Sequence, residues 1–489
     1  MHVAPLHLVK GRPVRLAMAA GLALGIAGTS GTALLASSVA SASPLKVTSC
    51  NDSGPGSLRA AVAGAAPGGT VQFAANCPAG PTGIPTITLT SGPIVIATSL
   101  TLEGPGASSL AISGGGDVPV FLTQPVTATI SGLTITDGTG SSGGGASSGP
   151  STGGGITNDG TLTLEGSKVS GNSATGAGGG ILNTGTLTLD HTTVSGNTVT
   201  GGSLANGGSA GGGGIMNGGT LTLSNTNVSS NAVNTGAVAN GGSAGGGGIF
   251  NSGTLTLSNT TVSANTVTAG TLATTGSPPG GGGIFNSGTL TLTRSAVSHD
   301  SATPGTVVGG GSLTGGDGGG ILQAGGTLTI GHSAITDNIA NGGIGPALAN
   351  SGEGGGIFYF FRHTSSGHQL INGSQVAGNS SSGDGGGIFN GGDTAITGGT
   401  ITGNTALGSG GGIDNGGTLT LGKDTISGNT DVTGGGAIYS GSLVGATAPP
   451  AVTAVKTSIV QANGTGLGVL VEDGTATISD SNLTVCTTC

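Results

Sequence analysis

Three acidic residues, Asp317, Glu353 and Asp384, occupy the same position in three successive sequence repeats. Each directly precedes a Gly-Gly-Gly-Ile block, where most other repeats carry Gly, Ser or Thr. If the repeats stack, the three carboxylates lie about 5 Å apart and repel one another unless a cation or an Arg separates them. Calcium takes carboxylate and carbonyl oxygens from loops, so we expect a calcium site here, although the sequence requires no cofactor. The alternative is three solvated loop acids.

Aromatic residues gather beside this acidic position. The segment Phe358-Tyr359-Phe360-Phe361 holds four of the chain's 8 Phe and 2 Tyr residues. Arg, His and Gln follow it, and aromatic faces near such polar groups can hold sugars. The residues that we expect to bind a ligand are Tyr359, Phe361, Arg362, His363 and His368. The alternative is an aromatic plug that fills a distorted repeat.

Signals for catalysis are weaker than these binding signals. Arg294 and His332 share one position on adjacent repeats, and His299-Asp300 stands near Asp337. No sequence cluster shows the several acids and the catalytic Arg or Lys expected of a polysaccharide lyase or glycoside hydrolase. If the protein is such an enzyme, the constellation to suspect is Asp317, Glu353, Asp384 and Arg362.

The four cysteines, Cys50, Cys77, Cys486 and Cys489, allow three pairings. Disulfides are the default use of paired cysteines in an exported protein. Pairing Cys50 with Cys77 would close the N-terminal segment, and pairing Cys486 with Cys489 would pin the last turn. A redox or zinc role for Cys486-Thr-Thr-Cys489 is the alternative, but no His neighbours these residues.

The first 42 residues are typical of a secretory signal peptide. They combine a basic start at 10–15, an apolar stretch at 16–26 and the small residues Ala40-Ser41-Ala42. We therefore expect cleavage before Ser43 and a secreted or extracellular protein, with cell-wall association as one outcome of export. The alternative is a retained membrane anchor, because apolar residues recur at 33–36.

Composition excludes several classes of partner. Without residues 1–42 the chain has 7 Lys and Arg against 19 Asp and Glu, a formal charge of −12. Phosphate binding needs Lys and Arg, so we expect no nucleic-acid partner. No other apolar run of about 20 residues exists, so we expect no membrane span in the mature chain, which we predict to be a monomer. With 110 Gly, 2% aromatics and no Trp, the core must be thin and aliphatic.

A sequence repeat begins at Gly153 and must position these residues. Gly-Gly-Gly-Ile-x-Asn, Gly-Thr-Leu-Thr-Leu and Val-Ser-x-Asn recur in that order. The gaps between successive Ile residues run from 25 to 37, which indicates a basic period of 25 with insertions. Such periods predict a solenoid, whose single turn cannot bury its apolar face alone. The Ile positions are 156, 181, 215, 249, 284, 321, 357, 388, 413 and 438.

Each repeat predicts three short strands separated by bends. In Thr161-Leu162-Thr163-Leu164, Thr and Leu alternate with period two, so Leu should point inward and Thr outward. Gly clusters and an Asn suit corners with positive φ. The predicted fold class is all-β, a single-stranded right-handed parallel β-helix with a short N-terminal helical cap. Its parts are the signal peptide at 1–42, a cap segment at 43–69, the β-helix at 70–485 and a tail at 486–489.

Two columns of Asn support stacking of the repeats. Stacked Asn amides can hydrogen-bond along their own column, so we assign both columns to structure. The first column is Asn158, Asn183, Asn217, Asn251, Asn286, Asn390 and Asn415. The second is Asn172, Asn197, Asn231, Asn265, Asn338, Asn379, Asn404 and Asn429, with Asp300 in its one gap.

These repeats resemble a known family. Gly-Gly-Gly-Ile-Phe-Asn at 246–251 and Gly-Gly-Gly-Ala-Ile at 434–438 resemble bacterial pectin-lyase-like β-helix proteins and polymorphic outer-membrane adhesins. The segments at 50–62 and 68–73 look like the opening module of those surface proteins. The resemblance implies right-handedness and a helical cap near 57–65. The chain departs from the adhesins because it lacks a C-terminal membrane barrel.

The expected function is non-catalytic binding of glycans or a cell surface. The insertions fall between the second Asn column and the next Gly cluster, so they should stack on one face, which is the default binding face. The alternative is a polysaccharide lyase or glycoside hydrolase of the pectin-lyase-like class.

A third hypothesis comes from the outward Thr residues. Thr pairs such as Thr161/Thr163 and Thr254/Thr256 recur in eight repeats and predict two regular files. These files resemble the Thr-x-Thr surfaces of β-helical ice-binding proteins. The alternative is that Thr simply favours strands and suits a solvent-facing ladder.

Overall fold

The computed structural model shows stacked parallel sheets. The described residues are 43–141, 151–201, 209–237, 243–270, 272–273, 279–308, 315–343, 352–359, 368–432, 436–441, 451–456, 458–461, 468–471, 474–479, 481–483 and 485–486. The predicted signal peptide lies outside them. Among the described residues, no helix is both long enough and apolar enough to cross a membrane.

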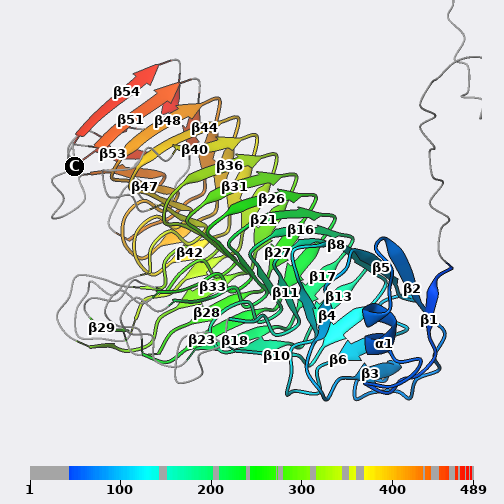
Figure 1. The fold of residues 1–489 in the computed structure, drawn as a ribbon. Coiled ribbons are helices and arrows are strands. Elements are labelled where there is room, and N and C mark those ends of the chain that lie inside the picture. The colour runs from blue at the N-terminus through cyan, green and yellow to red at the C-terminus, as the bar shows by residue number, and fades with distance from the viewer. Residues whose placement is uncertain are drawn as a thin grey trace, which may run out of the picture. The chain divides into compact units, whose positions relative to one another are not determined.

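Each turn of the solenoid, here called a coil, adds one strand to each of several sheets (Figure 1). One coil consists of β11 (Ile156–Asn158), β12 (Thr161–Glu165), β13 (Lys168–Ser170) and β14 (Ser173–Ala174). We name the sheets that contain these strands the Ile sheet, the Thr sheet, the Val sheet and the side sheet. Every pairing between their successive coils is parallel, so the chain is a right-handed parallel β-helix, as the sequence predicts.

The Thr sheet has 15 strands. Its strands are β1 (Leu45–Val47), β2 (Gly69–Phe73), β5 (Leu100–Glu103), β8 (Thr127–Ser131), β12, β16 (Thr186–Asp190), β21 (Thr220–Ser224), β26 (Thr254–Ser258), β31 (Thr289–Thr293), β36 (Thr327–Gly331), β40 (His368–Asn372), β44 (Asp393–Thr397), β48 (Thr418–Gly422), β51 (Ala451–Lys456) and β54 (Gly474–Ser479).

The Ile sheet has 14 strands. They are β4 (Ile94–Ile96), β7 (Phe121–Thr123), β11, β15 (Ile181–Asn183), β20 (Ile215–Asn217), β25 (Ile249–Asn251), β30 (Ile284–Asn286), β35 (Ile321–Gln323), β39 (Ile357–Tyr359), β43 (Ile388–Asn390), β47 (Ile413–Asn415), β50 (Ile438–Ser440), β53 (Val469–Val471) and β56 (Val485–Cys486).

The Val sheet also has 14 strands. They are β3 (Thr86–Thr88), β6 (Ala111–Ser113), β9 (Thr134–Thr136), β13, β17 (Thr193–Ser195), β22 (Asn227–Ser229), β27 (Thr261–Ser263), β32 (Ala296–Ser298), β37 (Ala334–Thr336), β41 (Gln375–Ala377), β45 (Thr400–Thr402), β49 (Thr425–Ser427), β52 (Ile459–Gln461) and β55 (Asn482–Leu483).

The side sheet is a fourth strand position beyond the three predicted ones. It follows the second Asn column, where short alternating runs such as Thr198-Val199-Thr200 are not among the three strands predicted for each repeat. Its 9 strands are β10 (Thr139–Gly140), β14, β18 (Thr198–Gly201), β23 (Ala232–Thr235), β28 (Thr266–Thr268), β33 (Ser301–Thr303), β38 (Ile339–Ala340), β42 (Ser380–Ser381) and β46 (Thr405–Ala406). Parts of the insertions pair as β19 (Ser209–Gly211) with β24 (Ser243–Gly245), and β29 (Leu272–Ala273) with β34 (Val307–Val308).

The core is a continuous aliphatic column inside the coils. Leu162 and Leu164 are fully buried, whereas Thr161 is exposed, so the predicted alternation is confirmed. Ile156 pairs with Ile181 and Leu162 with Leu187, so like residues stack on like. Each such side chain contributes about 1.5 to 3 kcal/mol when buried.

A second apolar column runs outside the coil, on the outer face of the Ile sheet. Phe250 and Phe285 stack with ring centroids 4.6 Å apart, and Phe358 and Phe389 do so at 5.0 Å. The start of the Gly block of the preceding coil covers these rings: a Cβ added at Gly211 would lie 2.5 Å from Phe250. The glycines therefore let the backbone close over the outer column.

The corners have a more specific conformation than the sequence indicates. The residue after each Thr-sheet strand is left-handed in ten successive coils, including His191, Arg294 and His332 with φ of 47°, 49° and 51°. The Asn residues expected at positive φ do not adopt it. In the second column, it is the residue before each Asn that has a positive φ, for example Ser230 at 57°. The Asn side chains lie inside instead.

Both Asn columns form hydrogen-bonded ladders. In the first, Nδ2 of Asn183 donates to Oδ1 of Asn217 at 2.7 Å. In the second, the backbone N and Nδ2 of Asn197 both donate to Oδ1 of Asn231, at 3.0 and 2.9 Å. Gln323 and Tyr359 occupy the first column between Asn286 and Asn390. The predicted structural role of the columns is confirmed.

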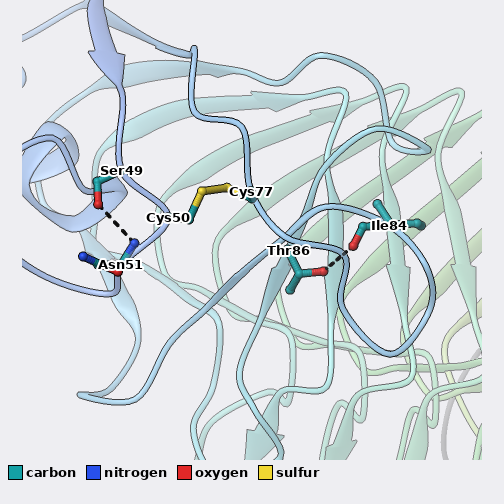
Figure 2. Close-up of a disulfide and its surroundings, with 6 residues drawn as sticks. All are labelled: Ser49, Cys50, Asn51, Cys77, Ile84 and Thr86. Atoms are coloured by element: carbon teal, nitrogen blue, oxygen red, sulfur yellow. Dashed lines mark hydrogen bonds between the residues drawn. A yellow bond between two sulfur atoms is a disulfide. The ribbon is translucent and has the colours of Figure 1, made fainter.

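The N-terminal segment precedes the regular coils. The helix α1 (Leu58–Ala63) lies within the expected range and buries Leu58 and Val62. The disulfide Cys50–Cys77, one of the pairings that the sequence left open, is present and ties this segment to the chain after β2 (Figure 2). Cys489 lies outside the described residues, as does the side chain of Cys486.

Arg59 of α1 also fixes this segment through Asp52, at an N–O distance of 2.6 Å. Burial opposes ionisation of Asp52, but hydrogen bonds from Ser91 and Arg59 outweigh it and hold its pKa well below the usual range.

The ladder can be tested at its centre. Asn231→Ala removes the acceptor of both Asn197 donors and leaves them buried without a partner, so we expect a loss of about 3 kcal/mol in the free energy of unfolding. Asn227→Ala, at an exposed position of the same coil, is the matched control. Denaturant unfolding followed by circular dichroism measures both. Equal stability of the two variants would contradict the structural role.

Candidate functional site

An open groove of about 700 Å³ follows the corner between the Thr sheet and the Val sheet. Five successive coils line it, with residues 259–261, 294–296, 332–334, 373–375, and 398 with 400. At one coil per step of about 4.8 Å, it extends on the order of 19 Å. This corner is not where the insertions enter, since they follow the side sheet.

The floor of the groove is fixed by a ladder of buried hydroxyls. The backbone N of Thr260 donates to Oγ of Ser295 at 3.2 Å, and that of Ser295 donates to Oγ of Ser333 at 3.0 Å. The backbone N of Ser333 donates to Oγ of Ser374 at 3.1 Å in the same way. These hydroxyls therefore already accept hydrogen bonds from the backbone, and the floor of the groove is fixed before any ligand binds.

Exposed polar side chains stand beside this floor. Asn259, Thr261 and Gln375 offer amide and hydroxyl groups, and Arg294 and His332 add donors on adjacent coils. A Cβ added at Gly373 would lie 3.3 Å from Cδ2 of His332, so the imidazole ring rests against the next corner glycine. The sequence shows Arg294 and His332 on one repeat position, but not that their corner forms a groove.

The acidic residues at 317, 353 and 384 lie on three successive coils. The backbone N of Gly318 donates to the carbonyl of Glu353 at 2.9 Å, and that of Gly354 donates to the carbonyl of Asp384 at 3.0 Å. Two carboxylates also accept from the next coil: Asp317 from Glu353 N at 3.1 Å and Asp384 from Ser409 N at 2.6 Å. We call Asp317, Glu353 and Asp384 the acid stack.

Among the described residues, no basic side chain forms an ion pair with the acid stack. Burial and then the charge of Glu353 raise the pKa of Asp317 well above its ordinary value. Burial and then Asp384 raise the pKa of Glu353 to about 8. Asp414, which the sequence analysis missed, has its pKa raised by burial and by Asp384, Glu353 and Asp431. It was missed because it replaces the Phe of Ile-Phe-Asn and so stands at a different repeat position.

The geometry does not form a metal centre among the described residues. Within them, no three His, Cys, Asp or Glu side chains are placed to hold one metal ion. Calcium at the acid stack stays a prediction from the sequence.

The residues expected to bind sugars are only partly described. Phe361, Arg362 and His363 lie outside the described residues. Tyr359 is 1% exposed and occupies the inward first Asn column, so its ring does not face a ligand in solvent. Burial and then Asp393 raise its pKa to about 12. His368 is exposed on the Thr sheet, 3.8 Å from Asp393. The structure thus places Tyr359 inside and His368 outside.

The residues suspected of catalysis do not meet in the groove. Asp317, Glu353 and Asp384 do not line it, Arg362 lies outside the described residues, and the lining that the structure describes contains no carboxylate. Most glycoside hydrolases need two carboxylates flanking the scissile bond. The groove therefore offers binding groups rather than that catalytic pair.

Fold and groove together define a parallel β-helix protein with a preformed polar groove along one corner. Comparisons with protein-family models, curated proteins and solved structures found no match for this chain.

The acid stack predicts a pH dependence of stability. The pKa of Glu353 is about 8 in the folded protein against an ordinary 4.5, so the folded state binds more protons between these values. Stability that is present at low pH is then lost as the pH rises toward about 8. Glu353→Gln cannot ionise, so we expect a higher melting temperature than the parent at about pH 9 in EDTA, and a smaller difference near pH 5.

Glu165→Gln, at an exposed end of β12, is the control and should melt like the parent. The same pH dependence in Glu353→Gln and the parent would contradict the stack. Calcium that raises the melting temperature of the parent, but not of Glu353→Gln, would establish the predicted cation site.

Proposed function

We propose that this chain is an exported, non-catalytic β-helix protein that binds glycan chains or another extended surface along the side of its coils. The observation that carries this proposal is the groove across five successive coils, lined by Asn, Gln, Thr, Arg and His side chains. An extended chain of several sugars matches the length and direction of such a site.

The chemistry of the groove suits sugar hydroxyls, which both donate and accept hydrogen bonds. Amides at Asn259 and Gln375 do the same, and Arg294 and His332 donate to hydroxyl, carbonyl or anionic oxygens. Because neighbouring coils fix the floor, little conformational entropy is lost when a ligand binds.

We infer that the protein acts outside the cell. A signal peptide at 1–42, a net negative charge and the Cys50–Cys77 disulfide favour a secreted or cell-wall-associated monomer. The resemblance of the repeats to pectin-lyase-like proteins and outer-membrane adhesins supports the same setting. The loop-bearing face expected from the insertions lies largely outside the described residues, so the groove is the better-supported site.

The groove can be tested with a polysaccharide panel that contains neutral and acidic polymers, such as xylan, cellulose, alginate and polygalacturonate. We expect the parent to be retained on at least one polymer without releasing products. The variant Arg294→Asn introduces the residue type that Asn259 has at the same corner of the preceding coil, so the corner conformation is retained. Because a charged donor is lost, we expect the variant to bind that polymer about tenfold more weakly.

His191→Asn is the matched control, because His191 shares the left-handed corner position but does not line the groove. Unchanged affinity in Arg294→Asn would remove the groove from the proposal. Steady product release by the parent would instead favour the lyase or hydrolase alternative.

The register of the Thr sheet favours a second candidate, binding of ice through outward Thr files. One file runs without a break through nine strands: Thr70, Thr101, Thr129, Thr163, Thr188, Thr222, Thr256, Thr291 and Thr329. A parallel file through seven strands is Thr127, Thr161, Thr186, Thr220, Thr254, Thr289 and Thr327. Both files exist because the strands of successive coils pair in exact register. The sequence predicts the files, and the strand pairing of the fold sets their register.

An ice-recrystallisation assay tests this candidate. If the files bind ice, the parent suppresses crystal growth and Thr254→Tyr, a bulky change in the middle of one file, abolishes the effect. Thr418→Tyr is the control, because His368 and Asp393 interrupt the file before it. Ordinary crystal growth at high concentrations of the parent protein would exclude the candidate.

A further inference from the structure

The second Asn ladder contains one acid. Asp300 stands between Asn265 and Asn338 and is 0% exposed. A buried carboxylate in a ladder of amides is unusual, because every position of the ladder must both accept and donate hydrogen bonds.

The amide positions show what each side chain must do. Oδ1 accepts from the preceding coil, as Asn231 Oδ1 does from N and Nδ2 of Asn197. Nδ2 donates twice, to Oδ1 of the next position and to a carbonyl of the preceding coil. For Asn338 these acceptors are Asn379 Oδ1 at 2.9 Å and the Val297 carbonyl at 3.0 Å.

Asp300 accepts hydrogen bonds in the same way as these Asn residues. Its Oδ1 accepts from the backbone N of Asn265 at 2.7 Å and from Nδ2 of Asn265 at 2.9 Å. Its own backbone N donates to Oδ1 of Asn338 at 3.0 Å. Oδ1 of Asp300 is thus equivalent to Oδ1 of an Asn.

Oδ2 of Asp300 occupies the place of the amide nitrogen. A Cβ added at Gly283 would lie 2.5 Å from Oδ2, as one at Gly248 would lie 3.0 Å from Nδ2 of Asn265. By the repeat, Oδ2 then faces two acceptors, the Val262 carbonyl and Oδ1 of Asn338. It is buried and has no hydrogen-bond partner among the described atoms.

We infer that Asp300 carries a proton on Oδ2 in the folded protein, and that this proton is a pH-sensitive lock that closes the ladder. With the proton, Oδ2 donates as Nδ2 does elsewhere. Without it, a buried anion faces two oxygens, and the hydrogen bonds that Oδ2 donates to the neighbouring coils are lost.

Among the described residues, Asp300 forms no ion pair. The titratable groups on the packed elements are His299 on its own coil, and Asp337 and Asp317 on the next. His299 and Asp337 are exposed corner residues 3.9 Å apart. Asp317 is buried and its pKa is raised, by burial first. Burial raises the pKa of Asp300 to about 8, although the donors on Asn265 and the backbone of Ser298 oppose this.

The effect of this proton on stability has a defined pH dependence. The pKa of Asp300 lies above its ordinary 3.8, so stability is fully present below about pH 4 and is lost as the pH rises through about 8. Asp300→Asn supplies the donor permanently and removes the contribution of Asp300 to the pH dependence, while the contribution of the acid stack remains. It also completes the amide ladder, so the variant should fold.

The test compares melting temperatures of the parent and Asp300→Asn between about pH 5 and pH 9. We expect Asp300→Asn to melt several degrees above the parent at pH 9, with a smaller difference at pH 5. Asp337→Asn, an exposed acid at the adjacent corner position, is the control and should follow the parent. A second measurement is the infrared carbonyl band of protonated carboxylic acid at about pH 6, taken as the parent minus the Asp300→Asn variant.

A positive band in the difference spectrum and the gain at pH 9 support the lock. The proposal is overturned if the band is absent, or if the loss of stability between about pH 5 and pH 9 is as large in Asp300→Asn as in the parent. Neither result depends on glycan binding, so the groove and the lock succeed or fail separately.

Discussion

The structure depends on hydrogen bonding between successive coils. A single coil holds only a few buried aliphatic side chains, and their burial does not offset the entropy of ordering about 25 residues. Stacking pairs each strand with its equivalents and places Leu on Leu and Ile on Ile. Every other feature follows from this register, because a residue type repeated in the sequence becomes a column in space.

The Asn ladders apply the same constraint to the bends. A bend exposes backbone N–H groups that no strand can pair, and the buried amides of the second column accept them from the preceding coil. A column made of one residue type is sensitive to single exceptions. Asp300 keeps the shape of the amide but can lose a proton, so a substitution that is nearly isosteric changes how the ladder responds to pH.

The exposed polar residues at one corner and the buried acids beside the Ile sheet have different consequences. Outside the coils, hydroxyl and amide groups at one corner remain exposed and form the groove, while the backbone beneath them is already satisfied. On the side where the Gly blocks close over the Ile sheet, acids are buried beside one another, which raises their pKa values. Binding chemistry and pH sensitivity therefore occupy separate parts of each coil.

The sequence by itself determined the β-helix, its period, the inward Leu and Ile, and the Asn columns, because each is a local pattern repeated in register. It left the cysteine pairing open, and the structure pairs Cys50 with Cys77. Tertiary structure decided what the repeat leaves open. The side sheet forms from runs of only two to four residues, Asp414 joins the acids from another repeat position, and Tyr359 turns inward although its neighbours suggested a surface cluster. The groove arises where Arg294 and His332 line the same corner on adjacent coils, since spacing gives the position of a side chain along the chain but not the shape of the corner that it occupies.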